Sequence, residues 1–207
     1  MIGPSLILTY SNNLKLPVQL HRLKALSYAG SYKGLYNDFT TKGVLHTDAG
    51  SLQTDAHLQI KKELTYKGNI TAINFDVGAL IDQQSIGNSS FHIELDGKGL
   101  QPEDLLLNFN GHISKADFQN YTYANIDLSG HIAQQILGVN GHIQDPNLDI
   151  NSDASIDWNT NDINYLLQAS ISHAAPNKLG WLEKDSVIIN SANVHTNLVG
   201  NRLNTVE

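Results

Sequence analysis

The chain has 207 residues, of which 41% are hydrophobic and only 16% are charged, and its formal net charge is −7. This acidic balance excludes binding to a nucleic-acid backbone, which needs clustered Lys and Arg, and the lack of cysteine excludes disulfides and thiolate chemistry. Asn, Ser, Thr, Gln and Gly fill the polar positions, and this usage predicts strands and turns rather than helices.

The two ends of the chain carry no targeting signal. The first eight residues contain no basic region and no apolar run long enough for a signal peptide or a membrane span. The last eight are typical of a strand or its turn. We therefore expect both ends to be cuts in a longer polypeptide, and residues 1–207 to form a single β-rich segment with no internal domain boundary.

Apolar and polar residues alternate with a period of two along much of the chain. From Ser51 to Ile60 every second residue is apolar or Thr, which predicts a strand with one apolar and one wet face. Similar stretches follow as far as residue 171, and they predict roughly twelve to fourteen strands. Only residues 20–26 and 178–182 could hold a helical turn or two.

The parity of the alternation changes at two places, near Ala72 and between Tyr123 and Ile126. Each change predicts a β-bulge or a turn, because a slip of one residue otherwise moves the apolar set to the other face. Clusters of Gly, Pro, Asn and Asp predict turns at residues 48–50, 87–89, 96–97, 101–104, 145–147 and 159–162.

The shared phase of the strands predicts an all-β fold, an extended and strongly twisted or curled sheet with one apolar face. The alternative is the buried face of an ordinary β-sandwich. Against it, the strands are rich in Ala, Thr and Gly, and only 7% of the residues are aromatic, which makes the lining thin. The residues expected to line the apolar face are Leu52, Leu58, Ile60, Phe91, Ile93, Phe109, Ile113, Leu128, Ile132, Val139, Ile143, Ile150 and Ile156.

Three strands share an Xaa-Gly-His-Ile signature that contains His112, His131 and His142. Three imidazoles could bind zinc if they converged, but each is expected on the polar face of its own strand, without a carboxylate at a fixed offset. We therefore favour exposed histidines over a metal site. Each glycine falls on the apolar face, which indicates a sharp bend or a close approach to the backbone.

No residue pattern predicts an enzyme, and none calls for a cofactor. Ser129 and His131 are near in sequence, but Gly130 separates them and no Ser lies in a strand-to-helix turn flanked by glycines. Paired carboxylates such as Glu103 and Asp104 fall at turns, where solvation explains them. A phosphate-binding loop is also missing, since no helix is expected after Gly97-Lys98-Gly99.

The order of several segments resembles the TamB family of the AsmA-like superfamily (translocation and assembly module) in its Bacteroidota form. The resemblance covers about residues 20–207 and lies in the succession of segments rather than in one motif. It begins with Phe39-Thr40-Thr41-Lys42-Gly43. It continues through residues 47–51, 66–70, 74–81, 85–90, 121–130, 144–148 and 169–200.

The resemblance implies a periplasmic protein, anchored in the inner membrane, whose long sheet curls into a taco-shaped open trough. It implies a role in outer-membrane biogenesis beside a BamA-superfamily barrel, through regions absent from this chain. The expected partner is phospholipid or another acyl-chain lipid, and unfolded outer-membrane protein is an alternative cargo. A structural or adhesive β-sandwich or solenoid module is the rival function.

Overall fold

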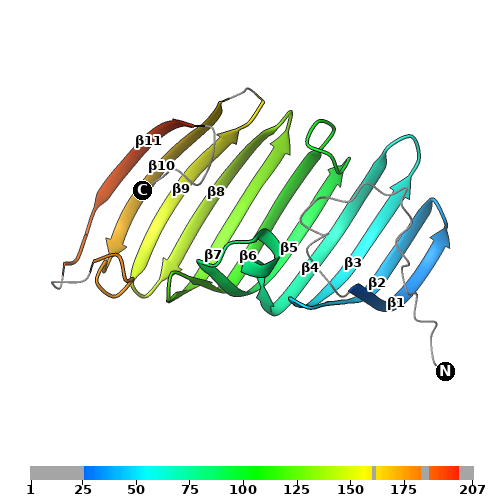
Figure 1. The fold of residues 1–207 in the computed structure, drawn as a ribbon, viewed down its shortest axis with the longest axis horizontal. Helices are drawn as coiled ribbons and strands as arrows, with labels where there is room; N and C mark the ends of the chain where they lie inside the picture. Colours follow the sequence, from blue (N-terminus) through cyan, green and yellow to red (C-terminus); the bar gives the residue numbers. More distant parts are fainter. Residues whose placement is uncertain (1–25, 160–161, 183–186, 201–207) are drawn as a thin grey trace.

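The computed structural model describes residues 26–159, 162–182 and 187–200. These residues form one curled, open sheet of eleven antiparallel strands, whose spatial order is their order along the chain (Figure 1). The sheet does not close into a barrel, so β1 and β11 are its two edges within the described part of the chain. The all-β prediction is confirmed.

The eleven strands are 9 to 13 residues long, and most of them are joined by hairpin connections. They are β1 (Leu26–Leu35), β2 (Asp38–Thr47), β3 (Gly50–Ile60), β4 (Leu64–Asp76), β5 (Ile86–Lys98), β6 (Leu106–Phe118), β7 (Tyr121–Ala133), β8 (Ile136–Asp145), β9 (Leu148–Asp157), β10 (Ile163–Ala174) and β11 (Ala192–Gly200).

The strand register carries the alternation of each strand across the whole sheet. Residues directly opposite each other in an antiparallel pair lie on the same face. Following such pairs from β1 to β11 gives four rows of residues on one face of the sheet. We call this face the apolar face, and we name each row after the residue that it contains on β6. The Ile113 row, for example, contains Tyr28, Leu45, Leu52, Ala72, Phe91, Ile113, Ile126, Ile143, Ile150, Ile171 and Ala192.

Both parity changes coincide with an asparagine whose φ is positive. The β4–β5 register shifts between Ala72 and Phe75, and Asn74 has φ 51°, so the predicted irregularity near Ala72 is confirmed. The second change falls at Asn125, with φ 50°. Asn tolerates this left-handed conformation better than most residues, which explains how the chain turns its apolar side chains to the same face twice.

Two of the predicted turns are wrong, because residues 87–89 and 96–97 lie inside β5. The turns at 48–49 and 146–147 join strands as expected, and residues 101–104 form turns in the β5–β6 connection. Part of the turn expected at 159–162, and residues 20–25 of a possible helical turn, lie outside the described residues. Gln119-Asn120 and Gln134-Gln135 make two further hairpin turns, in which all four residues have positive φ.

Glycines on the apolar face lie beneath aromatic rings of neighbouring strands. A β-carbon built on Gly130 would be 2.5 Å from Cζ of Phe109, its cross-strand partner. One on Gly97 would be 2.9 Å from the ring of Tyr66, also its partner. The close approach that the sequence indicated at Gly130 is therefore made by the ring of Phe109 together with the backbone carbonyl of Gly138 on β8, and a side chain larger than that of glycine would clash with both.

The described residues contain one short helix, α1 (Val77–Ile81), between β4 and β5. The carboxylate of Asp76 caps it by accepting a hydrogen bond from the Ala79 amide at 2.9 Å. The alternation of Ile73, Phe75 and Val77 predicts a strand as far as Val77, but β4 ends at Asp76 and Val77 begins α1. No described helix has the length and hydropathy to cross a bilayer.

Two small clusters cover the Ile113 row. One gathers Ala49, Ala72 and Phe75 under Val77 and Leu80 of α1. In the other, residues that follow β10 fold back, so that Leu179 is buried against Tyr123, Leu148 and Ile171. The Ile113 row is therefore covered at these two places. The two clusters contain nearly all of the fully buried apolar side chains among the described residues.

Asp145 ties β7 to the turn between β8 and β9. Its buried carboxylate accepts hydrogen bonds from the amides of Ala124 (3.0 Å) and Asn147 (2.9 Å) and from the hydroxyl of Tyr121. The network fixes the strand ends on which the second cluster rests.

Asp145→Ala is expected to lower the free energy of unfolding by about 2–4 kcal/mol, since it leaves buried donors without acceptors. The matched control is Asp153→Ala on the polar face of β9, which should change stability by less than about 0.5 kcal/mol. Urea unfolding followed by circular dichroism measures both. Equal midpoints for the two variants would contradict this account of the network.

Candidate functional site

The apolar face beyond the sealed Ile113 row is the candidate site. Its three remaining rows pass through Gly111, Phe109 and Leu107 of β6, and we call them the open rows. Among the described residues, no second layer packs over them, and Ala169 is the one open-row residue that is fully buried. Most of their large apolar side chains are half-buried by neighbours in the same rows.

All thirteen residues expected to line the apolar face lie on that one face. The sealed Ile113 row contains Leu52, Phe91, Ile113, Ile143 and Ile150; the open rows contain Ile93, Leu128, Phe109, Val139, Leu58, Ile132 and Ile156. Ile60 lies one row beyond Leu58, at the rim, opposite Leu64, and is 46% exposed. The structure thus brings them together, while their contact with lipid stays a prediction.

The two faces of the sheet differ completely in charge. None of the residues in the four rows of the apolar face is charged. The opposite face carries ion pairs between neighbouring strands, such as Lys42 to Asp55 at 3.0 Å and Lys67 to Asp96 at 2.9 Å. Such exposed pairs contribute little to stability, but they keep that face in water.

The open rows form a large patch. With strands about 4.8 Å apart and alternate residues about 6.7 Å apart along a strand, three rows on eleven strands extend roughly 50 Å by 20 Å. The footprint is about 1,000 Å², of which part is exposed because most of the large side chains are half-buried, and a soluble monomer usually leaves a few hundred Å² exposed in one apolar patch. Apolar surfaces of this extent are typical of interaction sites.

The three histidines of the Gly-His-Ile signature lie on the polar face and do not converge on one site. The imidazole of His112 contacts the Asp127 carboxylate at 2.7 Å, and that of His142 contacts Asp149 at 3.4 Å. The ring of His131 lies over Gly138 of β8. Within the described ranges, no three His, Asp or Glu residues are grouped as metal ligands.

Burial on the apolar face shifts the titration of Tyr66, whose ring covers Gly97. Desolvation raises the pKa of the Tyr66 phenol above its usual value of 10.0, and the nearby carboxylate of Asp104 adds to the effect. The folded state therefore holds this proton more tightly than the unfolded chain. The corresponding stability is complete below pH 10 and is lost as the pH rises through the folded pKa.

Tyr66→Phe keeps the ring over Gly97 and is expected to reduce the loss of stability above about pH 10. Near pH 7 the variant should unfold within about 1 kcal/mol of the parent protein, because its ring packing is unchanged. Urea midpoints measured from about pH 7 to about pH 11 test this expectation. The same alkaline slope in both proteins would contradict it.

Several features of the site give little signal in the sequence. The cover of the Ile113 row depends on Leu179, in a stretch whose only detectable pattern was a possible helical turn. The rings over Gly97 and Gly130 depend on the cross-strand partner, which a single strand does not identify. A group of hydroxyls from Tyr28, Thr41 and Thr54 also lies on the apolar face, assembled from three strands.

Comparisons of the chain with protein-family models, with curated proteins and with solved structures found no match.

Proposed function

We propose that the chain is a non-enzymatic β-groove that shields the acyl chains of lipids from water. One observation carries the proposal: three uncharged open rows run in register across all eleven strands and have no cover among the described residues. Each buried methylene group is worth about 0.8 kcal/mol, so even part of two acyl chains supplies ample affinity.

The chemistry of the face favours lipid over a folded protein as its cover. Protein interfaces usually carry about one hydrogen bond per 100–200 Å² and a polar rim that sets the orientation of the partner. The open rows offer only scattered hydroxyls, such as those of Thr41, Thr54 and Ser152, over their whole length. Hydrocarbon needs no such partners.

The dimensions also suit an acyl chain. Half of a bilayer's hydrocarbon core is about 15 Å thick, which is the depth that one layer of acyl chains fills. Acyl chains that lie parallel to the strands would therefore fit within the width of the three open rows, which is roughly 20 Å. Several could lie side by side between β1 and β11.

The resemblance to the TamB family supports a wider setting for this groove. In that setting the chain is part of a longer periplasmic protein, anchored in the inner membrane, that works with a BamA-superfamily barrel in outer-membrane biogenesis. Unfolded outer-membrane protein is the second candidate cargo, and it is favoured by the unpaired outer edges of β1 and β11 within the described sheet, which could each take an added strand. A structural or adhesive module is the rival function.

The direct test is the lipid content of the protein purified from cells under gentle conditions. The proposal predicts phospholipid in an organic extract, detected by mass spectrometry, at one or more molecules per chain. Protein free of lipid across several gentle preparations would favour the structural module. Co-purified protein fragments without lipid would favour the second cargo.

A further inference from the structure

One corner of the apolar face, formed by β1, β2 and β3, contains a hollow. Glycines replace bulky side chains at Gly30 and Gly43, and the ring of Tyr28 lies over both: β-carbons built there would be 2.9 Å and 2.8 Å from its atoms. Beside them the ring of Tyr32 stacks on that of Phe39, with centroids 4.6 Å apart. The space between has a volume of about 290 Å³.

The hollow has apolar walls and opens at the edge of the sheet. Phe39 and Leu58 are cross-strand partners in the same open row, so together they form one wall. Tyr32, on β1, is 50% exposed. Since β1 pairs only with β2 among the described strands, a long molecule can reach the hollow from the side.

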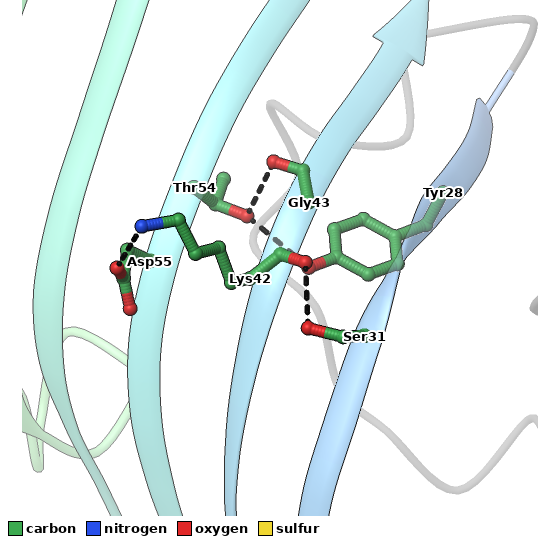
Figure 2. Close-up of polar contacts among 6 residues, drawn as sticks. All are labelled: Tyr28, Ser31, Lys42, Gly43, Thr54 and Asp55. Atoms are coloured by element: carbon green, nitrogen blue, oxygen red, sulfur yellow. Dashed lines mark hydrogen bonds and ion pairs between the residues drawn. The ribbon is translucent and has the colours of Figure 1, made fainter.

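The side chains of Tyr28 and Thr41 line the hollow, and the hydroxyl of Thr54 lies beside that of Tyr28, just outside the lining. The phenol of Tyr28 reaches across β2 toward β3 and lies 3.4 Å from Oγ1 of Thr54 (Figure 2). It also lies 2.7 Å from Oγ1 of Thr41 on β2. The Thr41 hydroxyl donates to the carbonyl of Ser31 at 3.2 Å. The Thr54 hydroxyl has two possible acceptors, Tyr28 Oη and the Gly43 carbonyl, at 3.4 and 3.5 Å.

Both of these contacts are at the long limit for a hydrogen bond, so the Thr54 hydroxyl can turn from them to an oxygen at the margin of the hollow. That oxygen must belong to an uncharged group. The nearest ion pair, between Lys42 and Asp55, extends from the opposite face of the sheet and cannot neutralise a charge in the hollow.

We infer that this hollow is a seat for one acyl chain of a lipid, and this inference rests on the proposed lipid groove. An ester or hydroxyl oxygen of the same lipid accepts a hydrogen bond from Thr54. A space of 290 Å³ equals the volume of about ten water molecules at about 30 Å³ each, and a methylene group is slightly smaller than a water. The seat therefore takes a segment of about ten carbons.

The first experiment measures how affinity depends on chain length. Monoacylglycerols with about 6 to 16 acyl carbons are titrated against the full chain by calorimetry. Each added methylene should tighten binding by about two- to fourfold until the seat is full, near ten carbons, and by less beyond that. Affinity that keeps rising at the same rate up to the longest chain would overturn a seat of this size.

The second experiment locates the bound acyl chain on the protein. It uses a monoacylglycerol that carries a diazirine near the end of a ten-carbon acyl chain. After photolysis, labelled peptides should come mainly from β1–β3. Leu58→Trp fills the hollow and should reduce this labelling at least fivefold, whereas Leu107→Trp, in the same row but on β6, should not. Circular dichroism identifies any variant that is misfolded.

Thr54→Val removes the donor and keeps the shape of the side chain. It should weaken binding of the ten-carbon monoacylglycerol about three- to tenfold, the range of one lost hydrogen bond. Unchanged binding would overturn the role of Thr54. Labels spread evenly over β2–β10 would overturn the seat but leave the lipid groove standing, and no labelling at all would count against the groove itself.

Discussion

Val139→Arg is expected to leave the sheet folded and to remove most of the lipid that the protein holds. Val139 lies in the middle of the open rows, opposite Gly130 on β7 and Ala154 on β9. Both neighbours are small, and apart from the Phe109 ring on Gly130 no described residue lies over them, so the long Arg side chain can bend toward water. The free energy of unfolding should change by less than about 1.5 kcal/mol.

Lipid binding responds differently, because acyl chains that cover the introduced guanidinium would have to desolvate its charge at a cost of several kcal/mol. Bound phospholipid should fall at least about tenfold, since each 1.4 kcal/mol is about a factor of ten. Phe109→Arg should act in the same way, with an added loss of stability because its ring no longer covers Gly130. The matched control is Asn140→Arg, the next residue of β8, which faces water on the other side.

Lipid per protein by mass spectrometry and protein abundance by immunoblot are measured together for the three variants. Detergent sensitivity of cells that make each variant adds a readout for the proposed role in outer-membrane biogenesis. If this face were a closed core, Val139→Arg would bury an unpaired charge and the protein would unfold. Lipid and abundance that fall in proportion would therefore contradict the open groove.

Phe75→Ala is expected to have the largest effect on stability, about 3–5 kcal/mol. The side chain is 1% exposed, packs edge-to-face on Phe91 with centroids 6.5 Å apart, and fills the cluster beneath α1. Its loss leaves a cavity where the chain leaves β4 for the helix. The adjacent end of the Ile113 row should open with it.

Ile73→Ala is the matched control, because Ile73 is on the same strand but 74% exposed. It should change stability by less than about 0.5 kcal/mol. Thermal and urea unfolding of the two variants test the contrast. Similar losses in both would mean that the cluster under α1 does not stabilise the sheet.

The face of each residue could be predicted from the sequence, because a period of two assigns it without knowledge of the partner strand. The alternation from Ser51 to Ile60 corresponds to β3, and the irregularity near Ala72 lies where Asn74 has a positive φ. The prediction of a turn at Asp96-Gly97 was wrong, because the sequence of one strand does not show which side chain of the neighbouring strand lies over a glycine. Gly97 looked like a turn residue, but in β5 it is the place where the ring of Tyr66 lies.

Features that join distant segments could not be predicted in this way. Asp145 ends β8, next to a turn whose position was expected, yet its bond to the Ala124 amide depends on how β7 and β8 pair. The helix α1 follows a strand with hardly a break, and its one sequence signal is Asp76 at the cap position. The hydroxyl contacts beside the proposed seat at β1–β3 join Tyr28, Thr41 and Thr54 from three strands.

The most direct test of the groove is crosslinking in living cells from two neighbouring positions. A photoreactive amino acid is placed at Leu128 of β7, in an open row, or at Ser129, the next residue on the polar face. After irradiation, the account predicts a lipid adduct on the protein with the probe at Leu128 and none, or far less, with the probe at Ser129. Equal adducts at the two positions, or none at Leu128 while the protein is folded and abundant, would contradict it.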